Sequence, residues 1–418
     1  MLLPDVDNSV PSPVGGYEII RRDVGLAPGE LANTLWTNPD PYEDSSPLNL
    51  RIFIKLLRVS SLFVRACEAL ASDQALLNYL RNRQFDVGML EQYDSCGFGI
   101  FRAIGVDNIV WLSATGIYAE QPQTIGVNYP LSYVPNLFAP LGDEMNFLDR
   151  AKNMFISAVT SLVYSHTRAE QSRIFWRTGG LDFGEDLLAT ARSSDSIVAN
   201  TLPHLDFAMP TSSKIAYIGG FTVQKQPGRL DMFWKEIADS STKGFILVTF
   251  GSIARTMDMP LKMQNNFFTA FSRFPEITFI VKYETANSTV AVPPNVQLTQ
   301  WIPQAKLMDH GKNSKVVEAK GAAVILDKMN LKTSDLMKAI TAVTSNRRYR
   351  ENCAKLSRMM RDASPIDHAE LLDYQVRRAA TLSRKSFQLT PRESTYLRIS
   401  SYLDVFIMIS IALVTIAS

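Results

Sequence analysis

The stretch NVQLTQWIPQAKLMDHGKN, residues 295–313, is the most informative part of this chain. Residues 296–300 have the pattern of a strand, and Trp301-Ile302-Pro303-Gln304 follows directly. An indole offers a flat apolar face to a pyrimidine, and an amide side chain after a φ-restricting proline can pair with the edge of the base. The stretch therefore predicts a base-binding turn after a strand. The alternative is a buried core tryptophan followed by an ordinary turn.

A second strand pattern, residues 245–250, ends at Gly251-Ser252. Open α/β sheets bind ligands at the carboxyl ends of their strands. A glycine there lets the backbone approach a diphosphate, and the Ser252 hydroxyl can donate to it. Strand-Gly-Ser taken alone is a weak signal, because it is usually just a tight turn.

Strand and helix patterns alternate in both halves of the chain. The expected strands are residues 85–90, 108–113, 214–218, 245–250, 277–283, 296–300 and 322–326, and the expected helices are 95–104, 263–274, 336–343 (after the caps Thr333 and Ser334) and 349–360. This alternation predicts an α/β protein with two parallel-sheet, Rossmann-like domains facing one cleft. The polar, breaker-rich segment 222–243 is the expected linker between domains 1–221 and 244–398.

Composition excludes several classes of protein. The 43 Lys and Arg residues nearly balance the 41 Asp and Glu residues, so no net field attracts nucleic acid, and the basic run 347–350 is expected to be a solvated helix face. The three cysteines are far apart and lack CxxC spacing, which argues against a disulfide framework and against a zinc site. His166 and His204 have no paired ligand nearby in the sequence, so no metal site is expected.

The two ends of the chain lead to different expectations. The opening MLLPDVD has no basic start and no apolar h-region, so no secretory signal is expected in the chain as written. Residues 402–418 read YLDVFIMISIALVTIAS, which is slightly shorter than the usual membrane-spanning length. Its weak polar face favours a partial transmembrane helix over the alternative, a terminal core helix.

Four segments together resemble the UDP-glycosyltransferase family, which in animals comprises the UDP-glucuronosyltransferases. They are FGSIA (250–254), NVQLTQWIPQAKL (295–307), DHGKNSKVVEAKGAAVIL (309–326) and SSYLDVFIMI (400–409), and the likeness covers most of the chain. The resemblance implies a GT-B fold and the transfer, with inversion, of glucuronate or glucose from a UDP donor to a small lipophilic acceptor, as in detoxification. It implies no metal and no cofactor beyond the UDP-sugar co-substrate.

The resemblance also assigns residues of the donor site. Trp301 would stack on uracil, Gln304 would bond its edge, Ser252 would contact the diphosphate and Asp309 would hold sugar hydroxyls. His310 stands where the family usually has Gln, which could alter the choice of sugar. Only four residues separate Gln304 from Asp309. In the family this interval holds a strand, a phosphate-facing turn, a helix and a second strand, and a unit of about 30 residues or more has no counterpart here.

On the acceptor side, the family's general base is a His after the first strand. The four histidines here are His166, His204, His310 and His368, and none follows an N-terminal strand, so the first βα unit is expected to be missing. Glu91, at the end of the strand in FDVGMLEQYD, takes the place of the partner carboxylate. The alternative is a turn residue before the helix that starts at Ser95. With both gaps, the chain is expected to transfer little sugar alone.

Two other functions remain open. One is a catalytically inactive relative that acts by pairing with intact family members, as a homo- or hetero-oligomer, and the other is a non-enzymatic protein that binds lipophiles. The family resemblance implies a single-pass protein of the endoplasmic reticulum membrane. The sequon Asn287-Ser288-Thr289 is consistent with a lumenal face.

Overall fold

Two α/β units make up the computed structural model of the chain. The described residues are 2–4, 16, 18–27, 30–36, 50–91, 93–114, 116–139, 141–179, 187–203, 206–220, 232, 234, 236, 243–250, 255–285, 288–300, 320–328, 330–361 and 366–381. The N-terminal unit comprises Met1–Thr34, Leu50–Phe221 and Ser364–Ser418, and the C-terminal unit comprises Leu35–Asn49 and Thr222–Ala363.

A four-stranded parallel sheet forms the centre of the N-terminal unit, with the order β3-β4-β5-β6. Its strands are β3 (Gly88–Glu91), β4 (Ile109–Ser113), β5 (Ser196–Ala199) and β6 (Ile215–Tyr217). The short strands β1 (Leu2–Pro4) and β2 (Ile20–Arg22) pair separately, also in parallel. Described helices lie between β3 and β4 and between β4 and β5, as is usual for crossovers between parallel strands, whereas the described residues between β5 and β6 form no α-helix. The expected strands at 85–90, 108–113 and 214–218 are confirmed, the last two with slightly narrower bounds and the first shifted to Gly88–Glu91.

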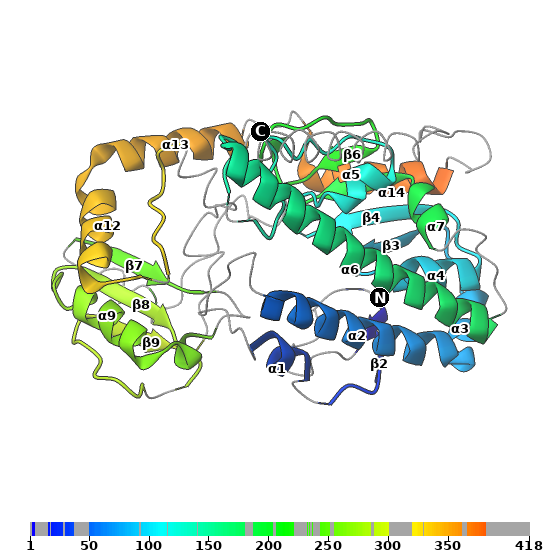
Figure 1. Cartoon of the computed structure of the whole chain (residues 1–418), viewed down its shortest axis with the longest axis horizontal. Helices are drawn as coiled ribbons and strands as arrows, with labels where there is room; N and C mark the ends of the chain where they lie inside the picture. Colours follow the sequence, from blue (N-terminus) through cyan, green and yellow to red (C-terminus); the bar gives the residue numbers. More distant parts are fainter. Residues whose placement is uncertain are drawn as a thin grey trace, which may run out of the picture. The chain divides into compact units, whose positions relative to one another are not determined.

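Helices cover both faces of this sheet (Figure 1). The helices of the unit are α1 (Glu30–Trp36), α2 (Leu50–Ser72), α3 (Gln74–Asn82), α4 (Cys96–Ile104), α5 (Glu120–Thr124), α6 (Phe147–Gly179), α7 (Leu188–Arg192) and α14 (His368–Thr381). The larger of the hydrophobic cores in this unit packs side chains of α2, α3, α4, α6 and α7 against one face of the sheet. On the other face, Val110, Val198 and Ala216 pack against Ala379 of α14. Helix α14 therefore packs with the N-terminal unit, whereas the expected domain 244–398 grouped these residues with the C-terminal domain.

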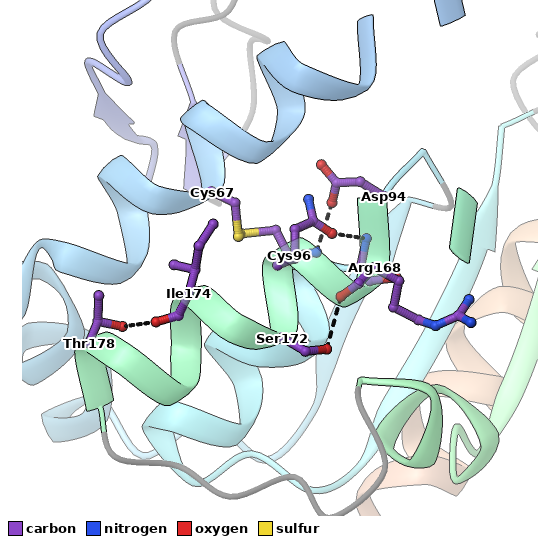
Figure 2. The surroundings of a disulfide bond; sticks show 9 residues. Cys67, Asp94, Cys96, Arg168, Ser172, Ile174 and Thr178 are labelled. Carbon is purple, nitrogen blue, oxygen red and sulfur yellow. Dashed lines mark hydrogen bonds between the residues drawn. A yellow bond between two sulfur atoms is a disulfide. The ribbon is translucent and has the colours of Figure 1, made fainter. Parts of the chain in front are cut away.

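A disulfide joins α2 to the first residue of α4, which corrects the expectation drawn from the cysteine spacing. Cys67 and Cys96 are both buried, with 5.6 Å between their Cα atoms (Figure 2). The two residues are 29 positions apart, but α2 and α3 fold back so that α2 packs beside α4. Sequence distance was therefore a poor guide, because helix packing decides which cysteines meet. Cys353 is free and exposed.

A partly buried carboxyl lies next to this disulfide. Asp94 accepts a hydrogen bond of 2.9 Å from the backbone N–H of Cys96, at the start of α4. Burial raises the pKa of Asp94 to about 6, although this hydrogen bond and the side chain of Gln171 oppose the shift. The Ser95 N–H donates to Gln171 Oε1 at 3.0 Å, which ties the start of α4 to α6.

Close packing explains the pattern Gly97-Phe98-Gly99 in α4. A Cβ on Gly99 would lie 2.1 Å from the ring of Phe175, and one on Gly97 would lie 3.1 Å from Leu90. Distances that short exclude any side chain at Gly99 unless the core shifts. The glycines therefore let α4 approach α6 and β3 closely.

The C-terminal unit holds a three-stranded parallel sheet in the order β7-β8-β9. Its elements are β7 (Phe245–Val248), the 3-10 helix η2 (Thr256–Asp258), α9 (Leu261–Phe271), β8 (Thr278–Lys282), β9 (Val296–Thr299), α12 (Thr333–Ser345) and α13 (Arg347–Arg361). Phe268 and Phe271 of α9 and Ile340 of α12 cover one face. Trp234 and Ile280 form a second, smaller hydrophobic cluster. The expected helices at 263–274, 336–343 and 349–360 are confirmed.

Two details of the C-terminal unit differ from the sequence expectations. Residues 322–326 form no strand, because none of the described strands pairs with them, and the segment is instead tied to α13 by Asn352, which donates to the Gly321 carbonyl at 2.9 Å. Thr333 and Ser334 lie inside the first turn of α12 rather than before it. The cap is Lys332, whose backbone N–H donates to Asp335 at 3.2 Å.

The expected transmembrane helix at 402–418 lies outside the described residues. Among the helices that the structure describes, none is both long and apolar enough to cross a membrane.

Candidate functional site

Glu91 ends strand β3 at the carboxyl edge of the N-terminal sheet. Both of its carboxylate oxygens accept from the backbone N–H of Ala114, at 3.0 and 2.9 Å. Ala114 directly follows β4, the neighbouring strand, so the contact spans the two strand ends. The structure thus places Glu91 where open α/β sheets bind ligands.

Polar groups from the next strand ends meet at the same edge. Asn200, just after β5, donates from Nδ2 to the Ala114 carbonyl at 3.1 Å and from its backbone N–H to the Ser113 carbonyl at 2.8 Å. Ser113 Oγ donates to the Gly116 carbonyl at 2.8 Å. These bonds fix the turn after β4, and so fix the amide that holds Glu91.

A second carboxyl, Asp206, lies in the segment that follows β5. Burial raises its pKa, although hydrogen bonds from the Phe207 N–H and the Thr201 side chain oppose the shift. A Cβ on Gly116 would lie 3.2 Å from Asp206 Oδ2, so this carboxyl reaches the turn after β4. Sequence reasoning missed Asp206. The available signal was an acidic residue in the segment TLPHLDF after the strand SIVA.

Aromatic hydroxyls are found close to these carboxyls. Desolvation raises the pKa of Tyr93, and Tyr118 and Glu91 add to the shift, which shows that the three groups are neighbours. Desolvation also raises the pKa of Tyr217, where Asp206 adds to the effect. The carboxyl edge of the N-terminal sheet therefore combines two carboxyls, an amide and aromatic side chains, a set suited to orienting a hydroxyl-bearing, partly apolar molecule.

Strands β7 and β9 carry the predicted donor motifs toward one edge of the C-terminal sheet. Because all three strands are parallel, Phe250, which follows β7, and Gln300, which follows β9, both leave from the carboxyl edge. Ser252, Trp301, Gln304, Asp309 and His310 all lie outside the described residues. The roles assigned to these five residues remain predictions.

A shielded ion pair occupies the same edge, at the end of β8 between the other two strands. Lys282 Nζ lies 2.9 Å from Glu284 Oε1, with side-chain exposures of 10% and 17%. Glu284 Oε2 also accepts from the Met257 N–H at 3.2 Å, and Thr256 Oγ1 donates to the Lys282 carbonyl at 2.6 Å. Sequence reasoning missed this pair, although a lysine and a glutamate directly after the apolar run TFIV were the signal.

The histidines do not gather at a site in the part of the chain that is described. His166 is exposed on α6 and His368 begins α14, while His204 and His310 lie outside the described residues. The described residues contain no cluster of three or more His, Cys, Asp or Glu side chains able to hold a metal ion.

Solved structures share this fold. A glycosyltransferase of kitacinnamycin aligns with a TM-score of 0.52 over 77% of this chain and 83% of its own, at 13% identity. A UDP-glucosyltransferase from Polygonum tinctorium aligns with a TM-score of 0.51 over 87% of this chain and 92% of its own, at 10% identity. Each of the two α/β units holds a parallel sheet, and the protein thus has the fold class of the GT-B glycosyltransferases.

Sequence comparison identifies the family. The profile of the UDP-glucoronosyl and UDP-glucosyl transferases matches residues 35–314 and 309–379, and the chain belongs to that transferase family, which uses a UDP-sugar as co-substrate. Rat UDP-glucuronosyltransferase 1A5 is 24% identical over 77% of this chain and 65% of its own length. Mouse 2-hydroxyacylsphingosine 1-beta-galactosyltransferase is 23% identical over 78% of this chain and 65% of its own length. The chain spans about two thirds of the length of these relatives.

Proposed function

We propose that the protein transfers glucuronate or glucose from a UDP donor to the hydroxyl of a small lipophilic acceptor, with inversion at the sugar carbon. Membership of the transferase family supports the reaction class. One relative, the mouse galactosyltransferase, is named for action on a 2-hydroxyacylsphingosine, a lipid with hydroxyl groups. The acceptor is therefore taken to combine a hydroxyl with an apolar body.

The single observation that carries the proposal is the fixed position of Glu91. In the reaction the acceptor oxygen bonds to the sugar carbon, the bond to UDP breaks, and the acceptor proton passes to a base. Glu91 is held by the Ala114 amide at 2.9 and 3.0 Å, so it is a positioning residue for the acceptor hydroxyl. None of the four histidines stands where the family has its base, so the proton passes to solvent and transfer is slow. The aromatic groups near it supply apolar surface for the body of the acceptor.

Donor binding is expected to be weak. By family resemblance, Trp301 stacks on uracil, Gln304 bonds its edge, Ser252 contacts the diphosphate, and Asp309 and His310 hold the sugar. The interval between Gln304 and Asp309 lacks the family's phosphate grip and ribose carboxylate, which removes several charge-assisted contacts of about 1.5 to 3 kcal/mol each. The two family matches overlap at residues 309–314, which supports a break at this place.

A transfer assay tests the acceptor side. The full chain is incubated with UDP-glucuronate or UDP-glucose and a panel of phenols, and slow transfer is expected. Glu91→Gln should lower kcat by about tenfold or more, and Glu91→Asp should restore part of it and shift the pH profile. Asp86→Asn is the matched control, because Asp86 is an exposed carboxylate just before β3, at the opposite edge of the sheet. Transfer that is indifferent to Glu91→Gln would contradict the proposed site.

Calorimetry with UDP tests the donor side. Trp301→Ala should weaken UDP binding by about 1 to 3 kcal/mol if the indole stacks on the base. Unchanged affinity in a folded variant would leave Trp301 as a core residue. Transfer that occurs only when an intact relative is co-expressed would favour the pairing function instead.

We also propose that the protein resides at the endoplasmic reticulum membrane. The disulfide between Cys67 and Cys96 supports this placement, because disulfides persist in oxidising compartments such as the lumen. The test is fractionation with alkaline extraction, together with an endoglycosidase shift that Asn287→Gln should abolish. A protein found wholly in the soluble fraction, without glycan, would contradict the proposal.

A further inference from the structure

Helix α6 buries a largely polar side. Asn153 donates from Nδ2 to the carbonyls of Leu131 and Val134, at 2.8 and 2.9 Å, and accepts from the Asn136 N–H at 2.7 Å. Gln171 accepts from the Ser95 N–H, and Thr167 bonds to Ser60 of α2. The buried residues of this helix are Asn153, Ile156, Ser157, Thr167, Arg168, Gln171, Ile174 and Phe175, so five of the eight are polar.

A row of large apolar residues is exposed on α6, among exposed residues that include Lys152 and Arg173. Leu148, Phe155, Leu162 and Trp176 are 65%, 46%, 70% and 63% exposed, respectively. With Ala169 they recur every seven residues, and seven residues make almost two full helical turns, so the row follows one face with a slow drift. A solvent-facing helix normally carries charged groups there. The row therefore needs an explanation other than core packing.

Helix α2 extends this apolar surface. The two helices run parallel, because Phe53 meets Phe155 with a 6.0 Å ring separation and, further along both helices, Glu68 lies 3.7 Å from Arg177. Ile54 and Leu57, near Phe53, are 50% and 47% exposed. The α6 face is defined here as Ile54, Leu57, Leu148, Phe155, Leu162 and Trp176. Exposed apolar patches of this kind mark interaction sites.

Cations accompany the α6 face. The exposed basic residues of the two helices are Arg51, Arg58, Arg65, Arg150, Lys152, Arg173 and Arg177. Residues 50–67 of α2 contain no carboxylate at all. Three of these arginines are paired, Arg65 with Glu30 of α1, Arg173 with Glu170 and Arg177 with Glu68, and these solvent-accessible pairs are weak. Apolar side chains flanked by cations match an anionic lipid surface.

We propose that the α6 face lies on the surface of an anionic lipid bilayer, with α6 parallel to the membrane plane and its apolar row in the headgroup region. Trp176 suits this depth, because indoles favour the membrane interface. The buried polar side of α6 excludes spanning. A symmetric pair of chains joined through this face would bring two rows of cations together, which disfavours a second copy as the occupant.

A local probe tests the proposal in the full chain. Leu162→Cys in a Cys353→Ser background is labelled with an environment-sensitive dye, and the disulfide-bonded cysteines do not react. Vesicles of phosphatidylcholine with phosphatidylserine should shift the dye emission to the blue, whereas pure phosphatidylcholine should do so far less. The control label is Asp86→Cys, an exposed position away from α6. Because the dye reports its own surroundings, attachment through residues 402–418 does not mimic the signal.

Charge reversal distinguishes electrostatic attraction to anionic lipid from non-specific hydrophobic adsorption. Lys152→Glu with Arg173→Glu should weaken the partition to anionic vesicles by about tenfold or more, and high salt should do the same. Lys355→Glu with Arg358→Glu on α13 makes the same change in net charge and should leave the dye response unaltered. No blue shift with anionic vesicles, or an equal shift with neutral ones, overturns the proposal. A shift that grows with protein concentration without lipid also overturns it, in favour of a second copy.

Discussion

The carboxyl edges of the two parallel sheets are built in different ways. In the N-terminal unit, side chains and turns from three strands are hydrogen-bonded around Glu91, Ala114 and Asn200. The helix after β3 is held by a disulfide and by a hydrogen bond to the partly buried Asp94. In the C-terminal unit, the described edge depends on one shielded pair, Lys282 with Glu284, and on hydrophobic packing behind it.

This difference suggests a division of labour. The N-terminal edge is tied together by its own hydrogen bonds, which under the proposed function would orient an acceptor. At the C-terminal edge the predicted donor residues come just after β7 and β9 rather than within the strands. Each unit should therefore respond to its own perturbations, and local hydrogen exchange is the suitable measurement, because a protein of two units need not unfold in one step.

The largest expected effect comes from the disulfide. Cys67→Ala with Cys96→Ala opens a link between residues 29 positions apart, which should destabilise the N-terminal unit by about 3 to 4 kcal/mol. Hydrogen exchange should show the loss in α2 and α4 and none in α9 or β8. Cys353→Ala, at the exposed free thiol, is the control and should change neither unit. Equal losses in both units would break the comparison.

Asp94 should make the stability of the N-terminal unit depend on pH. Its pKa of about 6 lies above the ordinary value of 3.8, so the folded state binds the proton more tightly. Stability should fall as pH rises from about 4 to about 6 and stay lower above that. Asp94→Asn keeps an acceptor for the Cys96 N–H and should gain about 3 kcal/mol above pH 6. Asp86→Asn is the control and should leave the pH dependence of stability unchanged. If Asp94→Asn also left it unchanged, Asp94 would not be the group responsible.

A smaller effect is expected at the C-terminal edge. Glu284→Gln removes the charge that pairs with Lys282, and should destabilise the C-terminal unit by about 1 to 2 kcal/mol. Glu276→Gln disrupts the exposed pair with Lys243 and should change little. Hydrogen exchange of the β8 amides, measured as urea is increased, gives the stability of the C-terminal unit in each variant and so distinguishes the two. If both variants behave alike, the pair at the end of β8 is not shielded as described.

The smallest effect on stability is expected at Glu91. Glu91→Gln retains an acceptor for the Ala114 N–H, so the N-terminal unit should keep its stability within about 0.5 kcal/mol. Thermal unfolding checks this directly. A large loss would make Glu91 a structural residue and would undermine the reading of any reduced transfer as functional.

The sequence predicted the parts of the fold in which local patterns and packing agree. Strands β3 and β4 have apolar runs bounded by turns. Helix α4 starts after Ser95 and contains two glycines, Gly97 and Gly99, that its close packing requires. It also placed Glu91 at a strand end. For residues 147–179 it gave no prediction, because α6 has apolar residues outside and polar residues inside, so no single apolar face marks the helix.

Features that depend on distant contacts were missed. The disulfide needs α2 to pack beside α4, Asp206 needs the segment after β5 to meet the turn after β4, and residues 322–326 resemble a strand but have no partner among those described. In each case the deciding neighbour is at least about 30 residues away or on another element. Periodicity cannot reveal such neighbours.

The packing of α14 on the N-terminal sheet has a consequence for how the chain is made. Val110, Val198 and Ala216 line a sheet face that α14 covers, yet α14 begins roughly 150 residues after β6 ends. At ribosomal rates of about 5 to 20 residues per second, that face waits roughly 8 to 30 seconds for its cover. The N-terminal sheet is therefore covered only when the last helix of the described residues is synthesised, and a nascent-chain chaperone has that interval in which to shield it.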